Sequence, residues 1–195
     1  MLKIVFATHN PHKLYEVKAM LPASVELLGL HDLNFTEEVP ETQPTLEGNA
    51  LQKARYVHER LGCNCFADDT GLEVEALDGA PGVISARYAG DHKNSEDNID
   101  KLLLQLEGKA SRRARFRTVI ALIIQGEEML FEGIVEGEII RERRGAEGFG
   151  YDPVFVPQGH SQTFAQMPLE LKNTLSHRFR AVKMLAEYLM SVNYM

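Results

Sequence analysis

The sequence lacks any long apolar segment, and this bears on where the protein works. Nowhere do about eighteen apolar residues run together, which is the least that a membrane-spanning helix needs. The short apolar start is followed by His9 and Asn10 too soon for the apolar stretch of a signal peptide. We therefore expect a soluble cytoplasmic protein without a membrane partner.

Cysteine is also scarce, and negative charge outweighs positive charge. The two cysteines, Cys63 and Cys65, are one residue apart, so the chain can form neither a disulfide framework nor a four-cysteine zinc site. The formal net charge is −7, whereas non-specific binding to nucleic acid needs a positively charged face. We expect no nucleic-acid partner, although a few lysines gathered at one site can still bind a small polyanion.

The hydrophobic pattern predicts one mixed α/β domain over residues 1–195, with no internal repeat or linker. Strand and helix patterns alternate, and the later strands follow each other as a hairpin would. Asn10 and Pro11 are typical of a helix start, as is Thr45, and Gly62 is typical of a helix end. Strands are expected at 2–7, 25–30, 64–67, 72–77, 114–124, 129–135 and 154–156, and helices at 10–21, 45–61, 95–106 and 176–191.

Two adjacent carboxylates, Asp68 and Asp69, follow a short buried strand in what the sequence predicts to be a turn ending at Gly71. Such a pair repels itself, so its placement at the end of a buried strand requires a cation, and Mg²⁺ is the usual one for oxygen ligands. Glu41, in the acidic loop 31–45, could complete the ligand set. The alternative is an acidic turn that is exposed to solvent.

Polar residues also gather where the first strand meets the first helix. Helix N-termini bind anions through their N–H groups and the helix dipole, and Lys13 adds a full positive charge. The alternative is an ordinary capped helix, since the segment lacks the signature of a phosphate-binding P-loop.

Two later segments carry further candidates. Glycines at 145–150 free the backbone to approach a ligand, and Phe149 and Tyr151 could stack on a base. The predicted start of the last helix gathers Lys172, His177 and Arg178, although basic residues at a helix N-terminus oppose its dipole. This conflict, together with the presence of Lys53 on the second helix, predicts an anion nearby.

Taken together, these segments resemble the inosine triphosphate pyrophosphatase family, which removes deaminated purine nucleotides. The resemblance covers nearly the whole chain. It rests on seven ordered motifs: Ala7-Thr8-His9-Asn10-x-x-Lys13, Glu41, Asn49-Ala50-x-x-Lys53-Ala54, Ala67-Asp68-Asp69-Thr70-Gly71-Leu72, Gly82-x-x-Ser85-Ala86-Arg87-Tyr88, Phe149-Gly150-Tyr151-Asp152-Pro153 and Ser176-His177-Arg178. One departure is Gly48, where many relatives carry Glu.

The resemblance implies a role for each matching position. Asp69 would be the catalytic proton acceptor and, with Glu41, would hold Mg²⁺, with Asp68 as a possible further ligand. The implied substrate-binding residues are Thr8, His9, Asn10, Pro11, His12, Lys13, Lys53, Thr70, Phe149, Gly150, Tyr151, Asp152, Lys172, His177 and Arg178. The implied fold is an elongated mixed β-sheet flanked by helices, with a nucleotide cleft between two lobes, and the implied assembly is a homodimer.

The expected reaction is magnesium-dependent hydrolysis of ITP, dITP and XTP to the nucleoside monophosphate and pyrophosphate. A donor such as Arg178 or a backbone N–H would donate to a purine 6-oxo group, whereas the 6-amino group of adenine would place donor against donor. One alternative is the related family that acts on pyrimidine triphosphates, but the Phe149–Asp152 and His177-Arg178 motifs favour the purine family. The other is a nucleotide-binding protein without catalytic activity, which the presence of Glu41, Asp68, Asp69 and Lys13 disfavours.

Overall fold

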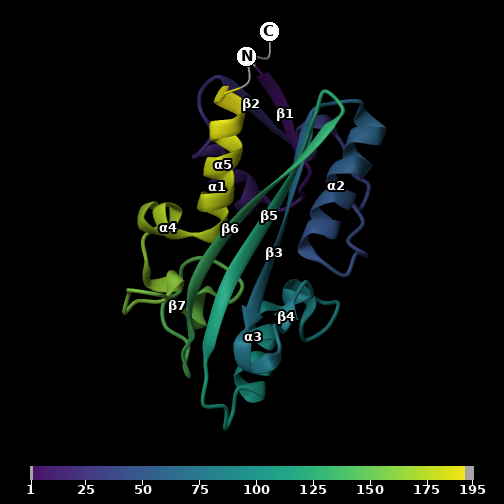
Figure 1. Cartoon of the computed structure of the whole chain (residues 1–195). Helices are drawn as coiled ribbons and strands as arrows, with labels where there is room; N and C mark the ends of the chain where they lie inside the picture. Colours follow the sequence, from purple (N-terminus) through teal and green to yellow (C-terminus); the bar gives the residue numbers. More distant parts are fainter. Residues whose placement is uncertain (1, 192–195) are drawn as a thin grey trace. The chain divides into compact units, whose positions relative to one another are not determined.

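The computed structural model describes residues 2–191, which form one sheet with helices packed on it (Figure 1). The strand order is β2-β1-β3-β5-β6-β7, with β4 pairing with β3. β1 pairs in parallel with β2 and β3, whereas β3–β4 and β6–β7 are antiparallel, so the sheet is mixed, as predicted. Within residues 2–191, no helix is long and apolar enough to cross a membrane.

The chain divides into two compact units. Unit 1 contains the residues up to Asp69, Thr118–Gly133 and the residues from Arg178 onward, and unit 2 contains Thr70–Arg117 and Ile134–His177. Strands β3 (Cys65–Val74), β5 (Arg113–Ile124) and β6 (Glu127–Ile139) contribute residues to both units. The two units are described separately below.

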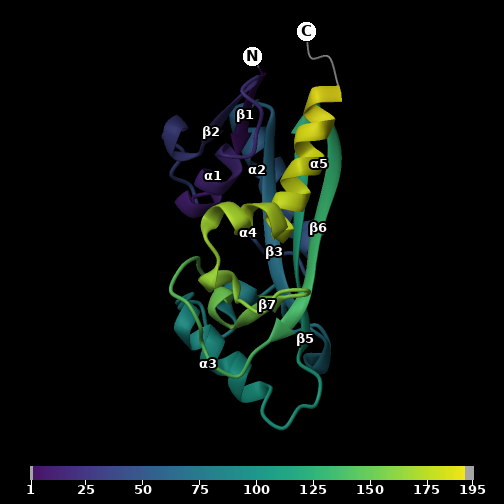
Figure 2. The ribbon, with the colours of Figure 1, turned by 90° about the vertical axis from the view of Figure 1, so that its left-hand side faces the viewer.

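Unit 1 contains the parallel strands β2, β1 and β3 together with one end each of β5 and β6, and helices cover both faces of the parallel strands. Besides β3, β5 and β6, its elements are β1 (Leu2–Phe6), α1 (Pro11–Lys18), β2 (Val25–Gly29), α2 (Leu46–Leu61) and α5 (His177–Ser191). Figures 1 and 2 show α1 and α5 on one face of these strands and α2 on the other. The apolar core on the α1 and α5 side contains Phe6 and Phe66, whose rings stack with centroids 4.6 Å apart. Val17 of α1 and Val182 of α5 belong to the same cluster.

Unit 2 has its own apolar core. It contains β4 (Pro81–Gly82), α3 (Ser95–Gln105), β7 (Phe155–Pro157) and α4 (Leu169–Leu175), besides the remaining parts of the long strands. The helix predicted at 95–106 is confirmed as α3, and its apolar stripe faces this core: Ile99, Leu102 and Leu106 are buried, and the partly buried Leu103 packs against the core. The core cluster also includes Leu72, Val74, Phe116, Val135, Ile139, Phe155 and Phe164.

The predicted acidic turn at 68–71 is wrong, because these residues lie inside the single strand β3. A Cβ atom on Gly71 would lie 2.6 Å from the carbonyl oxygen of Gly82, in the neighbouring strand β4. The glycine therefore permits a close approach between two backbones, which is the other common reason for glycine in a strand. The chain turns later, at Asp78 and Gly79, which both have positive φ.

The predicted helix starts and stops are largely confirmed. Asn10 caps α1 with Pro11 in its first turn, Thr45 caps α2, and Gly62 ends α2 with a φ of 59°. The hairpin loop is shorter than the gap between the strands predicted at 114–124 and 129–135, because β6 already begins at Glu127 and the two-residue turn is Gln125-Gly126. Positive φ at both turn residues matches the turn type that tight hairpins prefer.

The helices differ from the prediction in three places. α1 ends at Lys18 rather than running on to Leu21, and α3, capped by Asn94, ends at Gln105 rather than at residue 106. The short helix α4 was not predicted at all. Because α4 ends at Leu175 and α5 begins at His177, Lys172 lies in α4 and not at the start of the last helix.

Candidate functional site

The two adjacent carboxylates of β3 are separated by the geometry of the strand. Successive side chains of a strand point to opposite faces of the sheet. Asp68 contacts residues of α1 and α5, and Asp69 contacts residues of α2. Both carboxylates are buried, and each has cationic partners of its own instead of the single shared cation expected from the sequence.

Asp68 is the centre of a buried ion-pair chain in unit 1. Its Oδ1 accepts a hydrogen bond from Lys13 Nζ at 2.8 Å, and its Oδ2 lies 3.5 Å from Nε of Arg178. Arg178 Nη1 in turn donates to Oε2 of Glu16 at 2.5 Å. Burial by itself would raise the pKa of Asp68, but the charges of Lys13 and Arg178 hold it well below its usual range.

Glu16 was missed by the sequence interpretation. It lies in the middle of α1, where a glutamate is usually a solvated residue, yet it is 6% exposed. Its position three residues after Lys13 on the same helix is the only local signal that it shares a face with that lysine. The partner that explains its burial, Arg178, is 162 residues away in the sequence.

Asp69 belongs to a second group, which forms against α2. Its Oδ2 accepts from Nδ2 of Asn49 at 3.0 Å, and its Oδ1 lies 3.8 Å from Nζ of Lys53. The same ammonium lies 2.5 Å from Oε1 of Glu41. The structure therefore brings together Glu41, Asp69 and Lys53, three residues that the sequence proposed from separate segments.

The surroundings raise the pKa of both Asp69 and Lys53, which disfavours the charged form of the carboxyl and favours the charged form of the lysine. Burial raises the pKa of Asp69 above its usual value, and the charge of Lys53 only partly opposes that. Burial would lower the pKa of Lys53, but the carboxylates of Asp69 and Glu41 outweigh it, so the lysine remains firmly charged. Asp69 is consequently a better proton acceptor than Asp68, whose charged form is stabilised by its partners.

Asn49 ties the loop that carries Glu41 to the strand that carries Asp69. Its Oδ1 accepts from the backbone N–H of Gln43 at 2.8 Å, which leaves its Nδ2 to donate to Asp69. One turn along α2, Gln52 exchanges two hydrogen bonds with Thr42, at 2.9 and 2.8 Å. Asn49 belongs to the family motif Asn49-Ala50-x-x-Lys53-Ala54, although the resemblance did not imply a role for it in the site.

The donor chemistry of Glu41 and Asp69 fits a magnesium ion. Mg²⁺ is commonly held by one or two carboxylates, and water and substrate phosphates complete its coordination. Among residues 2–191, no group of three or more His, Cys, Asp or Glu side chains is arranged to hold a metal. Water and the phosphates of a bound nucleotide could supply the remaining oxygen ligands of an ion held by Glu41 and Asp69.

The segment between β1 and α1 is an ordinary capped helix start as well as a candidate anion site. Oδ1 of Asn10 accepts from the N–H groups of His12 and Lys13 at 2.9 and 3.3 Å, and Oγ1 of Thr8 accepts from the N–H of Asn10 at 3.1 Å. Pro11 occupies the first helical turn. The capped start of α1 thus positions Lys13, whose ammonium donates to the Asp68 carboxylate.

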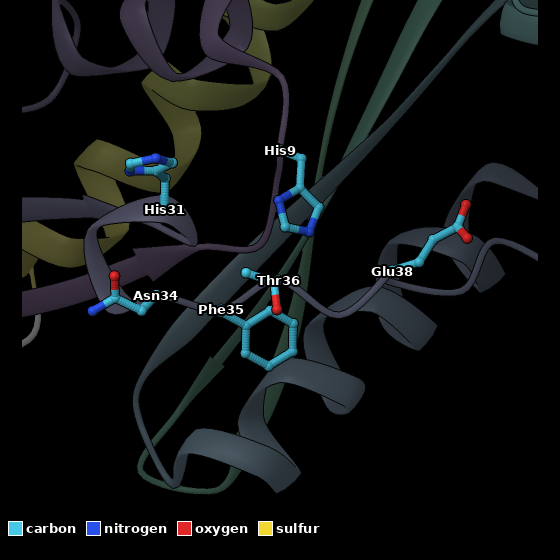
Figure 3. A pocket seen from close by; sticks show the side chains of 6 residues that line it. All are labelled: His9, His31, Asn34, Phe35, Thr36 and Glu38. Atoms are coloured by element: carbon cyan, nitrogen blue, oxygen red, sulfur yellow. The ribbon is translucent and has the colours of Figure 1, made fainter.

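His9 points elsewhere, into a surface pocket of about 410 Å³ (Figure 3). Its Nε2 lies 2.9 Å from the carbonyl oxygen of Glu37. The pocket is lined by His9, His31, Asn34, Phe35, Thr36 and Glu38. Since neither Glu41, Asp68 nor Asp69 lines it, the pocket is distinct from the two carboxylate groups.

A third group of predicted residues lies in unit 2. Oδ2 of Asp152 accepts from Nζ of Lys172 at 2.8 Å and from the N–H of Phe149 at 2.9 Å. The same ammonium lies 4.9 Å from the centroid of the Phe149 ring, within cation–π range. Gly148 has a φ of 80°, and a Cβ atom there would overlap the Asp152 carboxylate, so this glycine is what lets the loop close over Asp152.

The remaining predicted residues are used in different ways. Tyr151 is buried in the core of unit 2, where its hydroxyl donates to the carbonyl oxygen of Ser85 at 2.8 Å. The ring of His177 stacks on Phe116 with centroids 4.7 Å apart. Thr70 follows Asp69 on β3 and is half-buried. Gly150 has a positive φ in the loop that precedes Tyr151.

Comparison with known proteins gives matches over nearly the whole chain. A family model described as the Ham1 family matches residues 4–188. A protein of Christiangramia forsetii named dITP/XTP pyrophosphatase is 55% identical over 188 residues, which cover 96% of this chain and 99% of the relative. One of the same name from Bacillus subtilis is 45% identical over 193 residues, covering 97% and 98% of the two chains.

Solved structures agree with these matches. The structure of a HAM1 protein from Coxiella burnetii superposes with a TM-score of 0.92 at 37% sequence identity and covers 98% of this chain and 100% of its own. A nucleoside-triphosphatase / dITP/XTP pyrophosphatase from Mycobacterium abscessus has a TM-score of 0.78 at 45% identity, with 94% and 98% covered.

Proposed function

Because the chain belongs to the Ham1 family, we propose that it clears deaminated purine nucleotides from the nucleotide pool. It is a nucleoside-triphosphate pyrophosphatase that hydrolyses ITP, dITP and XTP to the nucleoside monophosphate and pyrophosphate. The observation that carries this function in the structure is the meeting of Glu41 and Asp69 at Lys53, two carboxylates and a lysine suited to a metal–phosphate complex.

We propose that Glu41 and Asp69 hold a Mg²⁺ ion. When bound there, the ion would neutralise the charge that develops on the leaving pyrophosphate. Asp69 would accept the proton of the attacking water, because burial has raised its pKa toward the range in which a carboxylate is a useful base. Asp68, with its pKa held low, is the poorer base of the two.

We assign the triphosphate to the cations of unit 1. Lys13 and Arg178 lie on opposite oxygens of Asp68, so this carboxylate sets the spacing of two positive groups. Such preorganised cations stabilise phosphoryl charge without having to reorganise during the reaction. In this assignment Asp68 is the counter-ion of the phosphate-binding residues rather than a further metal ligand. Thr8, Asn10 and the first turn of α1 would contribute hydrogen bonds.

We assign the base to Phe149, Asp152 and Lys172 of unit 2. The Lys172 ammonium, oriented by Asp152, can donate to a 6-oxo group, and the ring of Phe149 offers a stacking surface. The 6-amino group of adenine would place donor against donor, which leaves polar groups unpaired. Arg178, the donor considered from the sequence, is bonded to Asp68 and Glu16, whereas Lys172 lies beside the Phe149 ring, so Lys172 is the better candidate.

The activity is tested with a panel of ITP, XTP, GTP, ATP, dTTP and UTP with Mg²⁺, in which pyrophosphate and monophosphate are both measured. Preferred turnover of ITP and XTP is expected, and a preference for dTTP or UTP would support the pyrimidine rival instead. The base assignment predicts that Lys172→Met narrows the ratio of ITP to ATP in kcat/KM. Lys109→Met, which changes an exposed lysine of the same unit, is the matched control.

The family resemblance also leads us to propose a homodimer, for which light scattering of the purified protein would give the mass. We place the protein in the cytoplasm, where the nucleoside triphosphates that it would act on are held.

A further inference from the structure

Lys53 lies where the two proposed metal ligands meet. Its ammonium nitrogen is 2.5 Å from Oε1 of Glu41 and 3.8 Å from Oδ1 of Asp69. We propose that Lys53 is a built-in cation that competes with the metal ion for these two carboxylates. The proposal rests on the proposed function, because it takes Glu41 and Asp69 as the metal ligands.

The position of Lys53 is imposed by its surroundings. The residue is 5% exposed and lies on α2 one turn after Asn49, which holds Asp69 from the same helix face. A buried ammonium must be paired, since an isolated charge inside a protein is strongly unfavourable. Glu41 and Asp69 supply that pairing, so the lysine and a metal ion would rely on the same oxygen atoms.

The charges show why the two cations compete. Two carboxylates and one ammonium carry a net charge of −1, which is a weak site for a divalent ion. An arriving ion would also repel the ammonium at close range. A triphosphate relieves this conflict, because it offers the ammonium new anionic partners. Metal binding is therefore weak without nucleotide and is strengthened when the nucleotide and the ion arrive together.

Lys13 provides an internal comparison. It is also a lysine with a carboxylate partner on β3, but its Nζ is 2.8 Å from Asp68, which faces the opposite side of the strand. Lys13 and Lys53 would both lose a phosphate contact if their charge were removed. Only Lys53 would release the carboxylates of Glu41 and Asp69 to a metal ion.

The experiment measures the affinity of Mn²⁺ for the full-length protein without nucleotide, by calorimetry or electron paramagnetic resonance. Lys53→Met should bind Mn²⁺ about tenfold more tightly than the wild type, because the loss of the ammonium removes a close-range repulsion of the divalent ion. Its kcat/KM for ITP should fall. Lys53→Gln, which keeps hydrogen-bonding atoms near the carboxylates, serves as a second neutral variant and should also tighten binding. Circular dichroism checks the fold of each variant.

The control variants separate the possible outcomes. Lys13→Met should lower kcat/KM without tightening Mn²⁺ binding. Equal or weaker Mn²⁺ binding by the folded Lys53 variants would overturn the proposal, as would equal tightening in Lys13→Met. Asp69→Asn should abolish binding at this site. If it bound Mn²⁺ like the wild type, the metal assignment itself would be wrong, which is a different failure.

Discussion

Replacing each of the two adjacent carboxylates of β3 with its isosteric amide should affect the stability of the protein very differently. Asp68→Asn should destabilise the protein strongly, whereas Asp69→Asn should leave the fold intact and remove the activity. The contrast follows from the partners of each residue, because the two substitutions remove the same charge from neighbouring positions of one strand.

Asp68→Asn loses stability because Lys13 and Arg178 remain charged after their shared carboxylate is removed. Asp68 and Arg178 are each 2% exposed, so water does not replace the lost charge. Removing one partner of a buried ion pair costs about 3–5 kcal/mol. Glu16 still pairs with Arg178, and the amide oxygen can still accept one hydrogen bond, so we expect about 3 kcal/mol, at the low end of that range. For a chain of this size, such a loss lowers Tm by roughly 6–12 °C.

Asp69→Asn differs because its main cationic neighbour keeps a partner. Lys53 retains its contact with Glu41, and the new amide oxygen can still accept from Asn49. Since burial already disfavours the charged form of Asp69, the neutral amide should change the stability by less than about 1 kcal/mol. The activity should fall at least about a thousandfold, because a general base contributes roughly 10²–10⁴ and a metal ligand is lost with it.

The assay is urea unfolding followed by far-ultraviolet circular dichroism, paired with pyrophosphate release from ITP in the presence of Mg²⁺. Asp69→Asn should unfold at nearly the wild-type urea concentration and lack activity, whereas Asp68→Asn should unfold at a clearly lower urea concentration. A stable Asp68→Asn protein would refute the buried ion-pair reasoning. An active Asp69→Asn protein would refute the assignment of Asp69 as the base.

Three further predictions follow from the same structure. Because the pKa of Asp68 lies below its unfolded value near 4, its contribution to stability is present above about pH 4 and disappears as the pH falls further, so unfolding free energy measured below pH 4 should fall less steeply in Asp68→Asn. Gly71→Ala should destabilise the protein by about 1–3 kcal/mol in urea unfolding, since the new Cβ meets the backbone of Gly82, and an unchanged midpoint would contradict this contact. Cys63 should react with a thiol reagent long before Cys65, whose pKa burial raises to about 12, and mass spectrometry of the labelled peptides would identify the first site.

Local sequence signals determined much of the fold and the list of candidate residues. The caps at Asn10 and Thr45 and the stop at Gly62 depend on backbone groups within four residues, so their neighbours in the sequence suffice to predict them. The family motifs named Asp69 and Glu41. Gly71 shows the limit of such signals, because a glycine that accommodates another strand looks the same in the sequence as a glycine in a turn.

The pairing of charges was decided only by the tertiary structure. Lys13 and Asp68 are 55 residues apart, and Glu16 and Arg178 are 162 residues apart. The sequence suggested that Asp68 and Asp69 share one cation, because adjacent carboxylates repel each other. In the strand they face opposite sides, so the sheet and the helices on its two faces select a separate partner for each. No pattern of neighbouring residues contains that selection, since it arises when distant segments pack together.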